Sequence, residues 1–442
     1  MRPVPGPRSR HLRAVPGPPA PAPHDGLVDQ PVDQPVDEPV TVAIAGAEFG
    51  WGSSGKLSAV LGALRERSGG RPPRIVGLGT GLGRPLLTGH PVASWHDLPG
   101  AADAARDAVA RVVRAQGVRA ALVVLDGPVA MALEAAGVPT VFVDSLPFLW
   151  TDGDRDALPL EASAYCAQRS VELPAECRGV LAAVRHPRWV EAVVATAPGA
   201  PTGPGTRAGG RPYRTALVSL GGLRAPRLAD PACYPRAVVP AVLAALAAHG
   251  VQEAHIAGNL PDGLAARLTA GPAVPSRVTA GPLPHDAFLR RLGDCDVLLA
   301  SPGLTTLLEA GRTAVPTVCL PPQNLSQIFN GRFHSRAVGA DVRVTWPEDV
   351  LSEEAALALR SGGEDSALEL IYGGIARAAA GTAPAPGGRT TGDALREGVL
   401  AALRRAAEGA DWGGLTAAVG TGGAAQVADA LLEIARRAPL PA

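Results

Sequence analysis

The segment "GAEFGWGSSGKL", Gly46–Leu57, has the residue types and spacing of a glycine-rich loop that could bind phosphate. Its second half fits G-x-x-x-x-G-K, in which backbone N–H groups surround phosphates and the lysine contacts the terminal ones. A serine or threonine should follow the lysine as a ligand of Mg²⁺, but the next residue is Leu57. We therefore interpret the segment as a glycine-rich turn at the start of a helix, which favours a polar or anionic ligand, and not as a triphosphatase site.

Lys56 is the one lysine of the chain, and every other basic residue except histidine is arginine. The abundance of Ala, Gly, Pro and Arg indicates a strong coding bias. Under that bias, a chemical requirement and retention by chance both explain a single lysine.

Length and composition restrict the class of protein. The 442 residues suggest two to three domains, and the 41 basic and 41 acidic residues balance, which argues against a nucleic-acid binder. The five cysteines form no C-x-x-C pair, so neither a zinc site nor a disulfide framework is expected. Without a long apolar run or the apolar core of a signal peptide, we expect a cytoplasmic protein with no stable membrane insertion.

Strand and helix patterns alternate from residue 40 onward. "VTVAIAG" predicts a buried strand before the glycine loop, and "KLSAVLGALRERSG" predicts the helix after it. Strands "PRIVGLG", "AALVVLDG" and "PTVFVDSL" alternate with helices "AADAARDAVARVVRAQG" and "PVAMALEAAG". This alternation predicts an α/β fold with a parallel sheet covered on both faces.

The pattern restarts after a segment rich in proline and glycine, and "YRTALVSLGG" begins a second series that ends with strand "VPTVCLP". We expect two tandem Rossmann-like domains with an interdomain cleft. The predicted boundaries are a disordered Pro-rich tail (1–40), an acceptor domain (41–195), a linker (196–212), a nucleotide-sugar domain (213–380), and a Pro/Gly gap followed by C-terminal helices (381–442).

The stretch from Ser301 to Gly331 carries the strongest motif: a strand ending in "ASPG", a helix with "TTLLEAG", strand "VPTVCLP", and a polar loop with "SQIFN". In order and spacing it resembles the nucleotide-sugar site of GT-B glycosyltransferases, including the cell-wall N-acetylglucosaminyltransferases and UDP-sugar transferases. The resemblance covers most of residues 41–442 and is detailed only in 213–331. Ser326 stands where that family usually has Asp.

The resemblance implies a donor site for a UDP-sugar. The helix start at Gly303 and the turn at Gly221–Gly222 would hold the diphosphate, and Glu309 would bond the ribose hydroxyls. Asn330 would hold the polar loop in place. The residues implied in donor binding are Gly221, Gly222, Arg224, Leu283, Gly303, Leu304, Thr305, Glu309, Gln323, Asn324 and Gln327. No cofactor and no metal ion are expected besides the UDP-sugar co-substrate, and "DCD" (294–296) is interpreted as a cap or turn.

In related transferases the first-domain glycine loop often carries a histidine that faces the acceptor, and Lys56 stands in that place. It would neutralise either the leaving diphosphate or a carboxylate on sugar or acceptor, because a lysine at its ordinary pKa is a poor base. The base would then come from Glu48, Asp126, Asp144 or Asp152, with His285 and His90 as weaker candidates. The other residues expected to contact the acceptor are Gly52, Ser53, Ser54, Gly55, Phe148 and Trp150.

Phe148 and Trp150 are expected to be exposed in the loop "DSLPFLWTDGDR", where they would stack on a planar acceptor or cover the sheet. This loop and "EFGWGSSGKL" also resemble cytosylglucuronic acid synthases of nucleoside-antibiotic pathways. The implied function is a metal-independent glycosyltransferase (a hexosyltransferase) that moves a sugar from a UDP-sugar to a small molecule in secondary metabolism. The alternatives are a nucleotide-sugar hydrolase or epimerase of the same fold, and a catalytically silent partner of a true transferase.

Overall fold

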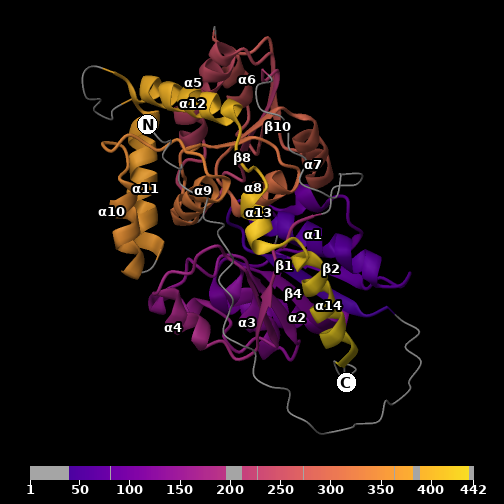
Figure 1. The fold of residues 1–442 in the computed structure, drawn as a ribbon. Helices are drawn as coiled ribbons and strands as arrows, with labels where there is room; N and C mark the ends of the chain where they lie inside the picture. The colour runs from indigo at the N-terminus through magenta and orange to yellow at the C-terminus, as the bar shows by residue number, and fades with distance from the viewer. Residues whose placement is uncertain are drawn as a thin grey trace, which may run out of the picture.

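The structure is a computed structural model that describes residues 39–79, 81–195, 212–225, 227–271, 273–362, 364–381 and 389–437. Nearly all of the predicted tail (1–40), linker (196–212) and second Pro/Gly gap lies outside the described residues. The described chain forms two α/β domains, one above the other in Figure 1. No described helix combines the length and apolar character required to cross a lipid bilayer.

The first domain is built on a seven-stranded sheet in which every strand pairs in parallel with its neighbours, in the order β3-β2-β1-β4-β5-β6-β7. Parallel strands require crossover helices, which cover both faces and leave the strands almost wholly apolar. The strands are β1 (Thr41–Gly46), β2 (Arg74–Leu78), β3 (Val92–His96), β4 (Val118–Val124), β5 (Thr140–Asp144), β6 (Ala164–Gln168) and β7 (Pro187–Val190). The helices between them are α1 (Gly52–Arg67), η1 (Arg84–Leu87), α2 (Ala102–Gln116), α3 (Gly127–Ala135), η2 (Asp152–Ala157) and α4 (Cys177–Ala182).

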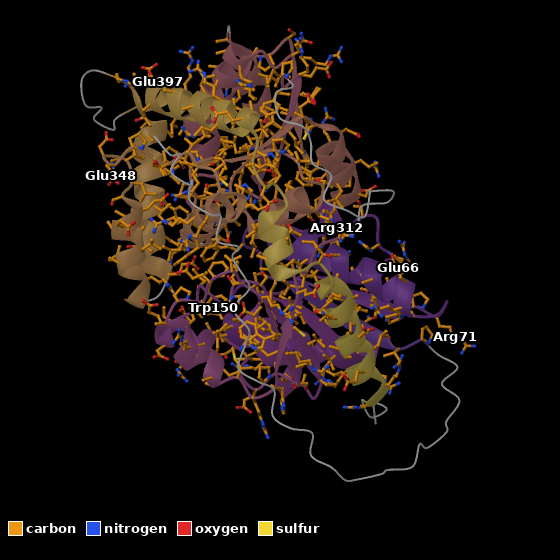
Figure 2. All side chains as sticks on the ribbon, in the orientation of Figure 1. Glu66, Arg71, Trp150, Arg312, Glu348 and Glu397 are labelled. Carbon is orange, nitrogen blue, oxygen red and sulfur yellow. The ribbon has the colours of Figure 1, made fainter. Side chains whose placement is uncertain are left out.

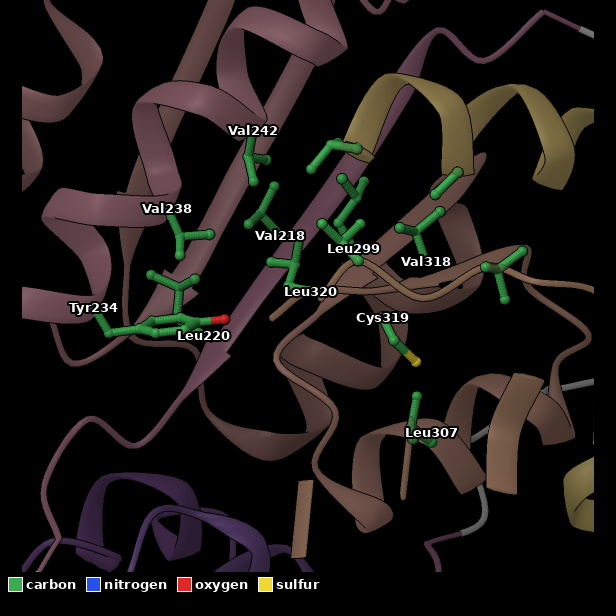
Figure 3. Packing of buried hydrophobic residues seen from close by; sticks show 14 of the residues in the cluster. Val218, Leu220, Tyr234, Val238, Val242, Leu299, Leu307, Val318, Cys319 and Leu320 are labelled. Atoms are coloured by element: carbon green, nitrogen blue, oxygen red, sulfur yellow. The ribbon is translucent and has the colours of Figure 1, made fainter. Parts of the chain in front are cut away.

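The second domain has a five-stranded parallel sheet in the order β10-β9-β8-β11-β12. Its strands are β8 (Thr215–Gly221), β9 (Glu253–Gly258), β10 (Arg277–Gly281), β11 (Val297–Ala300) and β12 (Thr317–Cys319). Its helices are α5 (Cys233–His249), α6 (Leu264–Thr269), α7 (His285–Asp294), α8 (Leu304–Arg312), α9 (Leu325–Val338), α10 (Glu353–Ala358), η3 (Leu359–Gly362), α11 (Glu364–Ala379), α12 (Thr391–Glu408) and α13 (Gly414–Val419). Figure 3 shows Val238 and Val242 of α5 packed beside Val218 of β8.

The last helix, α14 (Gly423–Arg437), leaves the second domain and packs against the first. Figure 1 shows the yellow C-terminal chain running from α12 in the upper domain past α13 to α14 in the lower one. Val427 and Leu431 of α14 are fully buried with α1 and the first sheet. The C-terminal helices therefore belong to both domains and tie them together.

The predicted α/β architecture of two Rossmann-like domains is confirmed. In each sheet the strand order reverses beside the first strand, next to β1 in the first domain and β8 in the second. Ligands of such sheets bind beyond the carboxyl ends of the strands at this reversal point. The loops in those positions are the glycine loop after β1, the Gly221–Gly222 turn after β8, and the Ser301–Gly303 turn after β11.

One element was predicted wrongly. The segment around Gln327 and Asn330 was expected to be a polar loop, but it forms helix α9. The Asn324 side chain caps this helix by accepting a hydrogen bond from the Gln327 N–H, and Leu325 and Ile328 on its inner face are buried. The polar residues obscured this helical spacing in the sequence.

Candidate active site between the two domains

A cavity of about 330 Å³ lies where the two sheets face each other. It is within the usual size range of small-molecule sites. Both glycine turns of the second domain and the glycine loop of the first domain line it. Each strand-end loop therefore reaches the place that the sheet topology predicts.

Two glycine turns that line this cavity, one from each domain, touch each other. The Gly50 N–H donates a hydrogen bond to the Arg224 carbonyl oxygen at 3.0 Å. A Cβ on Gly222 would lie 2.7 Å from the carbonyl carbon of Gly50, closer than real side chains approach. Gly50 and Gly221 have φ values of 65° and 68°, which glycine adopts at little cost. The glycines therefore allow the two domains to meet backbone to backbone.

Two of the helices that begin at the cavity, α8 and α1, have no side-chain cap. Helix α8 starts after Gly303, and helix α1 starts after Trp51. The Thr305 hydroxyl donates to the Gly52 carbonyl oxygen at 3.3 Å, so the two helix starts are in contact. Neither first turn contains an acidic residue. The positive ends of both helix dipoles therefore favour an anionic ligand between them.

Glu309 of α8 and His285 of α7 form a buried pair in the cavity wall. Their Oε1 and Nε2 atoms are 2.7 Å apart, and their side chains are 3% and 6% exposed. Burial by itself would lower the pKa of His285, but the charge of Glu309 and the hydrogen bond to it raise the pKa above its ordinary value. The pair holds the Glu309 carboxylate in a fixed position at the cavity.

Lys56 lines the same cavity from the first domain and is 1% exposed. Its Nζ donates to Gln168 Oε1 at 3.0 Å and to the Val193 carbonyl oxygen at 3.4 Å. Burial lowers the pKa of Lys56 to about 8, although the negative charge of Glu309 opposes this effect. Lys56 therefore combines a desolvated amine with a place in the cavity wall, a combination typical of functional lysines.

A hydrogen-bond network fixes the amide side chains at the start of α9. Gln327 Oε1 accepts from the Ser301 hydroxyl at 3.0 Å and from the Gln323 N–H at 2.8 Å. Gln323 Nε2 donates to Ser301 Oγ at 2.6 Å. Asn330 Nδ2 donates to the Pro302 carbonyl oxygen at 2.9 Å, which ties α9 to the turn before α8.

The structure brings together every residue predicted for the donor. The cavity lining includes Gly221, Gly222, Arg224, Leu283, Gly303, Leu304, Thr305, Glu309, Gln323, Asn324 and Gln327. Of the first-domain predictions, Gly52, Ser53, Gly55, Lys56 and Trp150 line it as well. Ser54 is buried and, like the carboxylates proposed as bases, is not among the described residues that line the cavity.

Each of those carboxylates has a partner elsewhere. Glu48 is exposed and accepts a hydrogen bond from the Gly81 N–H at 2.7 Å. Asp126 caps α3 by accepting from the Val129 N–H at 3.1 Å, and burial raises its pKa. Asp152 accepts from Arg155 at 2.9 Å.

Asp144 is fully buried and accepts three hydrogen bonds, from the Leu146 N–H, Trp150 Nε1 and the Tyr165 hydroxyl, each at 2.9 Å. Burial raises the pKa of Asp144 to about 6, although these three bonds oppose the effect. It orients Trp150, whose side chain lines the cavity.

Of the two histidines considered as weaker candidates for the base, one lies at the cavity and the other does not. His285 lines the cavity, whereas His90 shares a hydrogen bond with the Ser58 hydroxyl at 2.9 Å and is absent from the described lining.

The prediction that Phe148 is exposed is wrong, because its side chain is 1% exposed. It packs against Phe329 and Phe333 of α9, with ring centroids 5.6 and 5.1 Å away. Phe148 therefore holds the two domains together and does not reach the cavity. The sequence of the loop around Phe148 does not indicate that side chains of the other domain cover it.

Glu364 and Tyr372 of α11 also line the cavity, and sequence reasoning missed both. They lie well beyond the motif region and on a helix whose pattern indicates only packing. Among the described residues, no cluster of three or more histidine, cysteine or acidic side chains is arranged to hold a metal ion.

No protein-family model matches the chain, and no curated protein matches it. Solved structures similar to it include MurG from Acinetobacter baumannii (13% identity, TM-score 0.42), covering 83% of this chain and 100% of that one. A putative UDP-N-acetylglucosamine 2-epimerase from Listeria monocytogenes has 14% identity and a TM-score of 0.47, covering 83% and 96% of the two chains. UGT89C1 from Arabidopsis thaliana has 15% identity and a TM-score of 0.46, covering 83% and 100%.

These identities and TM-scores are too low to transfer an activity to this chain. The chain's own sheets and cavity establish the architecture: two Rossmann-like domains facing each other across a cleft, which is the GT-B fold.

Proposed function

We propose that the chain is a glycosyltransferase that moves a sugar from a UDP-sugar to a small-molecule acceptor without a metal ion. The observation that carries the proposal is the cavity itself. The donor residues implied by the motif come from separate turns and helices, and all of them line that one space. The space lies between two uncapped helix starts, which suits a diphosphate.

The donor would lie along the second domain. The α8 N-terminus and the Gly221–Gly222 turn would bind the diphosphate, and Arg224 would add charge-assisted hydrogen bonds. Glu309, held by His285, would accept hydrogen bonds from the ribose hydroxyls. The Leu283 backbone would contact the base, and the amides of Gln323 and Gln327 would contact the sugar.

Transfer requires that the acceptor attack the anomeric carbon as its bond to the diphosphate oxygen breaks. Negative charge then develops on the leaving diphosphate. Fixed N–H groups and cationic side chains facing that position lower the barrier without rearranging. Lys56, at the start of the other helix, adds a positive charge to this end of the cavity whenever it is protonated.

A narrower proposal concerns the substrates. A buried lysine in the wall is suited to a carboxylate on the donor sugar, as in UDP-glucuronate. Together with the resemblance to cytosylglucuronic acid synthases, this favours a uronate donor and a nucleobase-like acceptor in nucleoside-antibiotic biosynthesis.

Incubation with a panel of UDP-sugars in EDTA, with cytosine as one acceptor, tests the proposal. Mass spectrometry of the products and release of UDP are the readouts. Sugar-containing product in EDTA supports the transferase. UDP release that never requires an acceptor indicates a hydrolase. Conversion of the UDP-sugar to an isomer indicates an epimerase. A protein that neither turns over nor binds any UDP-sugar is a silent partner.

Gln327→Ala and Gln252→Ala provide a matched pair for the same assay. Gln327 lines the cavity, whereas Gln252 is exposed just before β9, at the opposite end of the sheet. We expect Gln327→Ala to lower transfer about tenfold or change the preferred sugar, and Gln252→Ala to do neither.

A further inference from the structure

Two polar groups of α11 reach the cavity without a role in donor binding. Glu364 and Tyr372 both line it. The Tyr372 hydroxyl is buried and has no hydrogen-bond partner within the part of the chain that the structure describes. Leaving a buried hydroxyl unpaired costs about 1–3 kcal/mol. A ligand in the cavity that bonds this hydroxyl would remove that cost.

Contacts from both domains fix the start of α11 at this wall. Arg360, just before α11, donates to the carbonyl oxygens of Phe148 at 3.0 Å and Leu149 at 3.1 Å. Arg227, in the loop after the Gly222 turn, pairs with Asp365 at 2.7 Å and Glu369 at 3.1 Å. Figure 1 shows α11 extending from the second domain toward the first.

Apolar side chains from two further segments, residues 146–150 and the loop after Gly222, also line the cavity. Trp150 lies at the boundary between the two domains, and its ring nitrogen is already bonded to Asp144 (Figure 2). The other apolar side chains that line the cavity from these segments are Leu146, Leu149, Leu223, Ala225 and Leu228, and Arg224 of the same loop lines it as well. A largely apolar lining that also carries the Glu364 carboxylate and the Tyr372 hydroxyl suits a planar, mostly apolar molecule that carries an O–H or N–H group.

Charges around Glu364 favour a carboxylate that can take up a proton. Burial, together with the nearby carboxylates of Asp154 and Asp365, raises the pKa of Glu364 to about 7. Asp154 is itself hydrogen-bonded to Thr151, and Asp365 is paired with Arg227. Burial and the charge of Glu364 raise the pKa of Tyr372, which therefore stays a neutral hydroxyl. A base is most effective when its pKa is near the working pH.

We propose that Glu364 is the general base of an acceptor site formed by α11, the Leu146–Trp150 segment and the loop after Gly222. The proposal rests on the transferase function above. The acceptor O–H or N–H donates to Glu364, and the acceptor oxygen or nitrogen bonds to the anomeric carbon of the donor. The bond from that carbon to the diphosphate oxygen breaks, UDP leaves with the electron pair, and the proton moves to Glu364. Tyr372 orients the acceptor by hydrogen bonding.

Glu364→Gln tests this role, with Glu348→Gln as the matched control, because Glu348 is exposed and is not among the described residues that line the cavity. Two probe acceptors separate catalysis from structure at pH 8.5: 2-phenylethanol, which must lose a proton, and 4-nitrophenol, which is already ionised. We expect Glu364→Gln to lower transfer to 2-phenylethanol about 100-fold or more and to lower transfer to 4-nitrophenol less than fivefold. Equal losses for both acceptors, or no loss, would overturn the proposal.

Donor hydrolysis, with water as the acceptor, gives the same comparison without an organic probe. Glu364→Gln should slow it, and the low-pH decline in the wild-type rate, centred near the pKa of Glu364, should disappear. A rate and pH profile unchanged by the substitution would contradict the assignment.

Calorimetric titration with UDP separates the two proposals. If neither wild type nor Glu364→Gln binds UDP, the transferase function fails. If both proteins bind UDP with affinities within twofold of each other, but the acceptor comparison and the pH profile show no role of Glu364 in proton transfer, the transferase function stands and the assignment of Glu364 fails.

Discussion

Gly222 and Gly50, from different domains, approach so closely that a Cβ on Gly222 would lie 2.7 Å from the carbonyl carbon of Gly50. Both glycines line the cavity. A hydrogen bond from the Gly50 N–H to the Arg224 carbonyl oxygen links the same two segments. The residue type at position 222 therefore limits how closely the domains can meet.

Gly222→Ala should keep the domains apart. We expect kcat to fall about tenfold or more and the radius of gyration in solution to increase, because a misplacement of about 1 Å at a reacting centre can cost 100-fold in rate.

Gly62→Ala is the control, since a Cβ there meets nothing within 4 Å. It should stabilise α1 by about 0.5–1 kcal/mol and leave kcat unchanged. A Gly222→Ala protein with normal kcat and dimensions would show that the domains work without this contact.

Lys56→Met should make the protein more stable and less active. Unfolded Lys56 is protonated at pH 7, whereas burial lowers its folded-state pKa from 10.5 to about 8, which corresponds to a cost of about 3 kcal/mol. This cost is present below pH 8 and is lost as the pH rises through 10.5. Because the hydrogen bonds to Gln168 and Val193 are lost, we expect a net gain of about 1–3 kcal/mol in urea unfolding at pH 7.

Turnover of Lys56→Met should fall about 100-fold. Arg65→Met, a substitution of an exposed residue on the same helix, should change neither the stability in urea unfolding nor the turnover. Because the chain has one lysine, isotopically labelled lysine gives a single side-chain NMR signal from which the pKa of Lys56 can be measured. A pKa of Lys56 near 10.5, or full activity in Lys56→Met, would rule out the functional role of the lysine.

Glu309→Gln should change the pH dependence of stability. The pKa of His285 is raised in the folded state, so the ion pair stabilises the fold fully below the ordinary value of 6.5 and is lost as the pH rises through the folded-state pKa. The wild type should therefore lose stability at this site as the pH rises above 6.5, and the variant should not.

We expect UDP affinity to fall about tenfold in Glu309→Gln, because the charged acceptor for the ribose hydroxyls is gone. Asp286→Asn, which alters an exposed carboxylate beside His285, is the control and should have a smaller effect on both measurements. Unchanged UDP affinity in Glu309→Gln would contradict its place in the donor site.

Asp144→Asn should behave as a structural variant. An asparagine at this position cannot accept every bond that Asp144 accepts, and leaving Trp150 Nε1 unpaired costs about 1–3 kcal/mol. Because the folded-state pKa of about 6 exceeds the ordinary 3.8, the wild type should also lose stability as the pH rises from 4 to 6, and the variant should not. A change in the pH–rate profile at full stability would instead identify Asp144 as the base.

The fold and the donor side of the site could be predicted because they depend on local patterns. β1, β8 and β11 are short apolar runs that end in glycine or in "SPG", so their ends mark the cavity directly. The partner of a side chain in another domain has no such local signal. Phe148 is covered by Phe329 and Phe333, and Glu364 reaches the cavity because Arg360 and Arg227 hold α11 in place.

The same limit applies to Lys56. The sequence marks it as unusual, but only the structure shows that Gln168 and Val193 hold its amine inside the first domain. Its burial, and hence the lowered pKa, involves residues more than a hundred positions away in the chain.

Calorimetric titration of the purified protein with UDP, UDP-glucose, UDP-glucuronate and Mg-ATP tests the central claim most directly. We predict that UDP and at least one UDP-sugar bind in EDTA, that Mg-ATP does not compete, and that UDP-glucuronate binds more tightly than UDP-glucose. Tight Mg-ATP binding without a response to any uridine nucleotide would contradict the account and would make Gly50–Lys56 a triphosphate site.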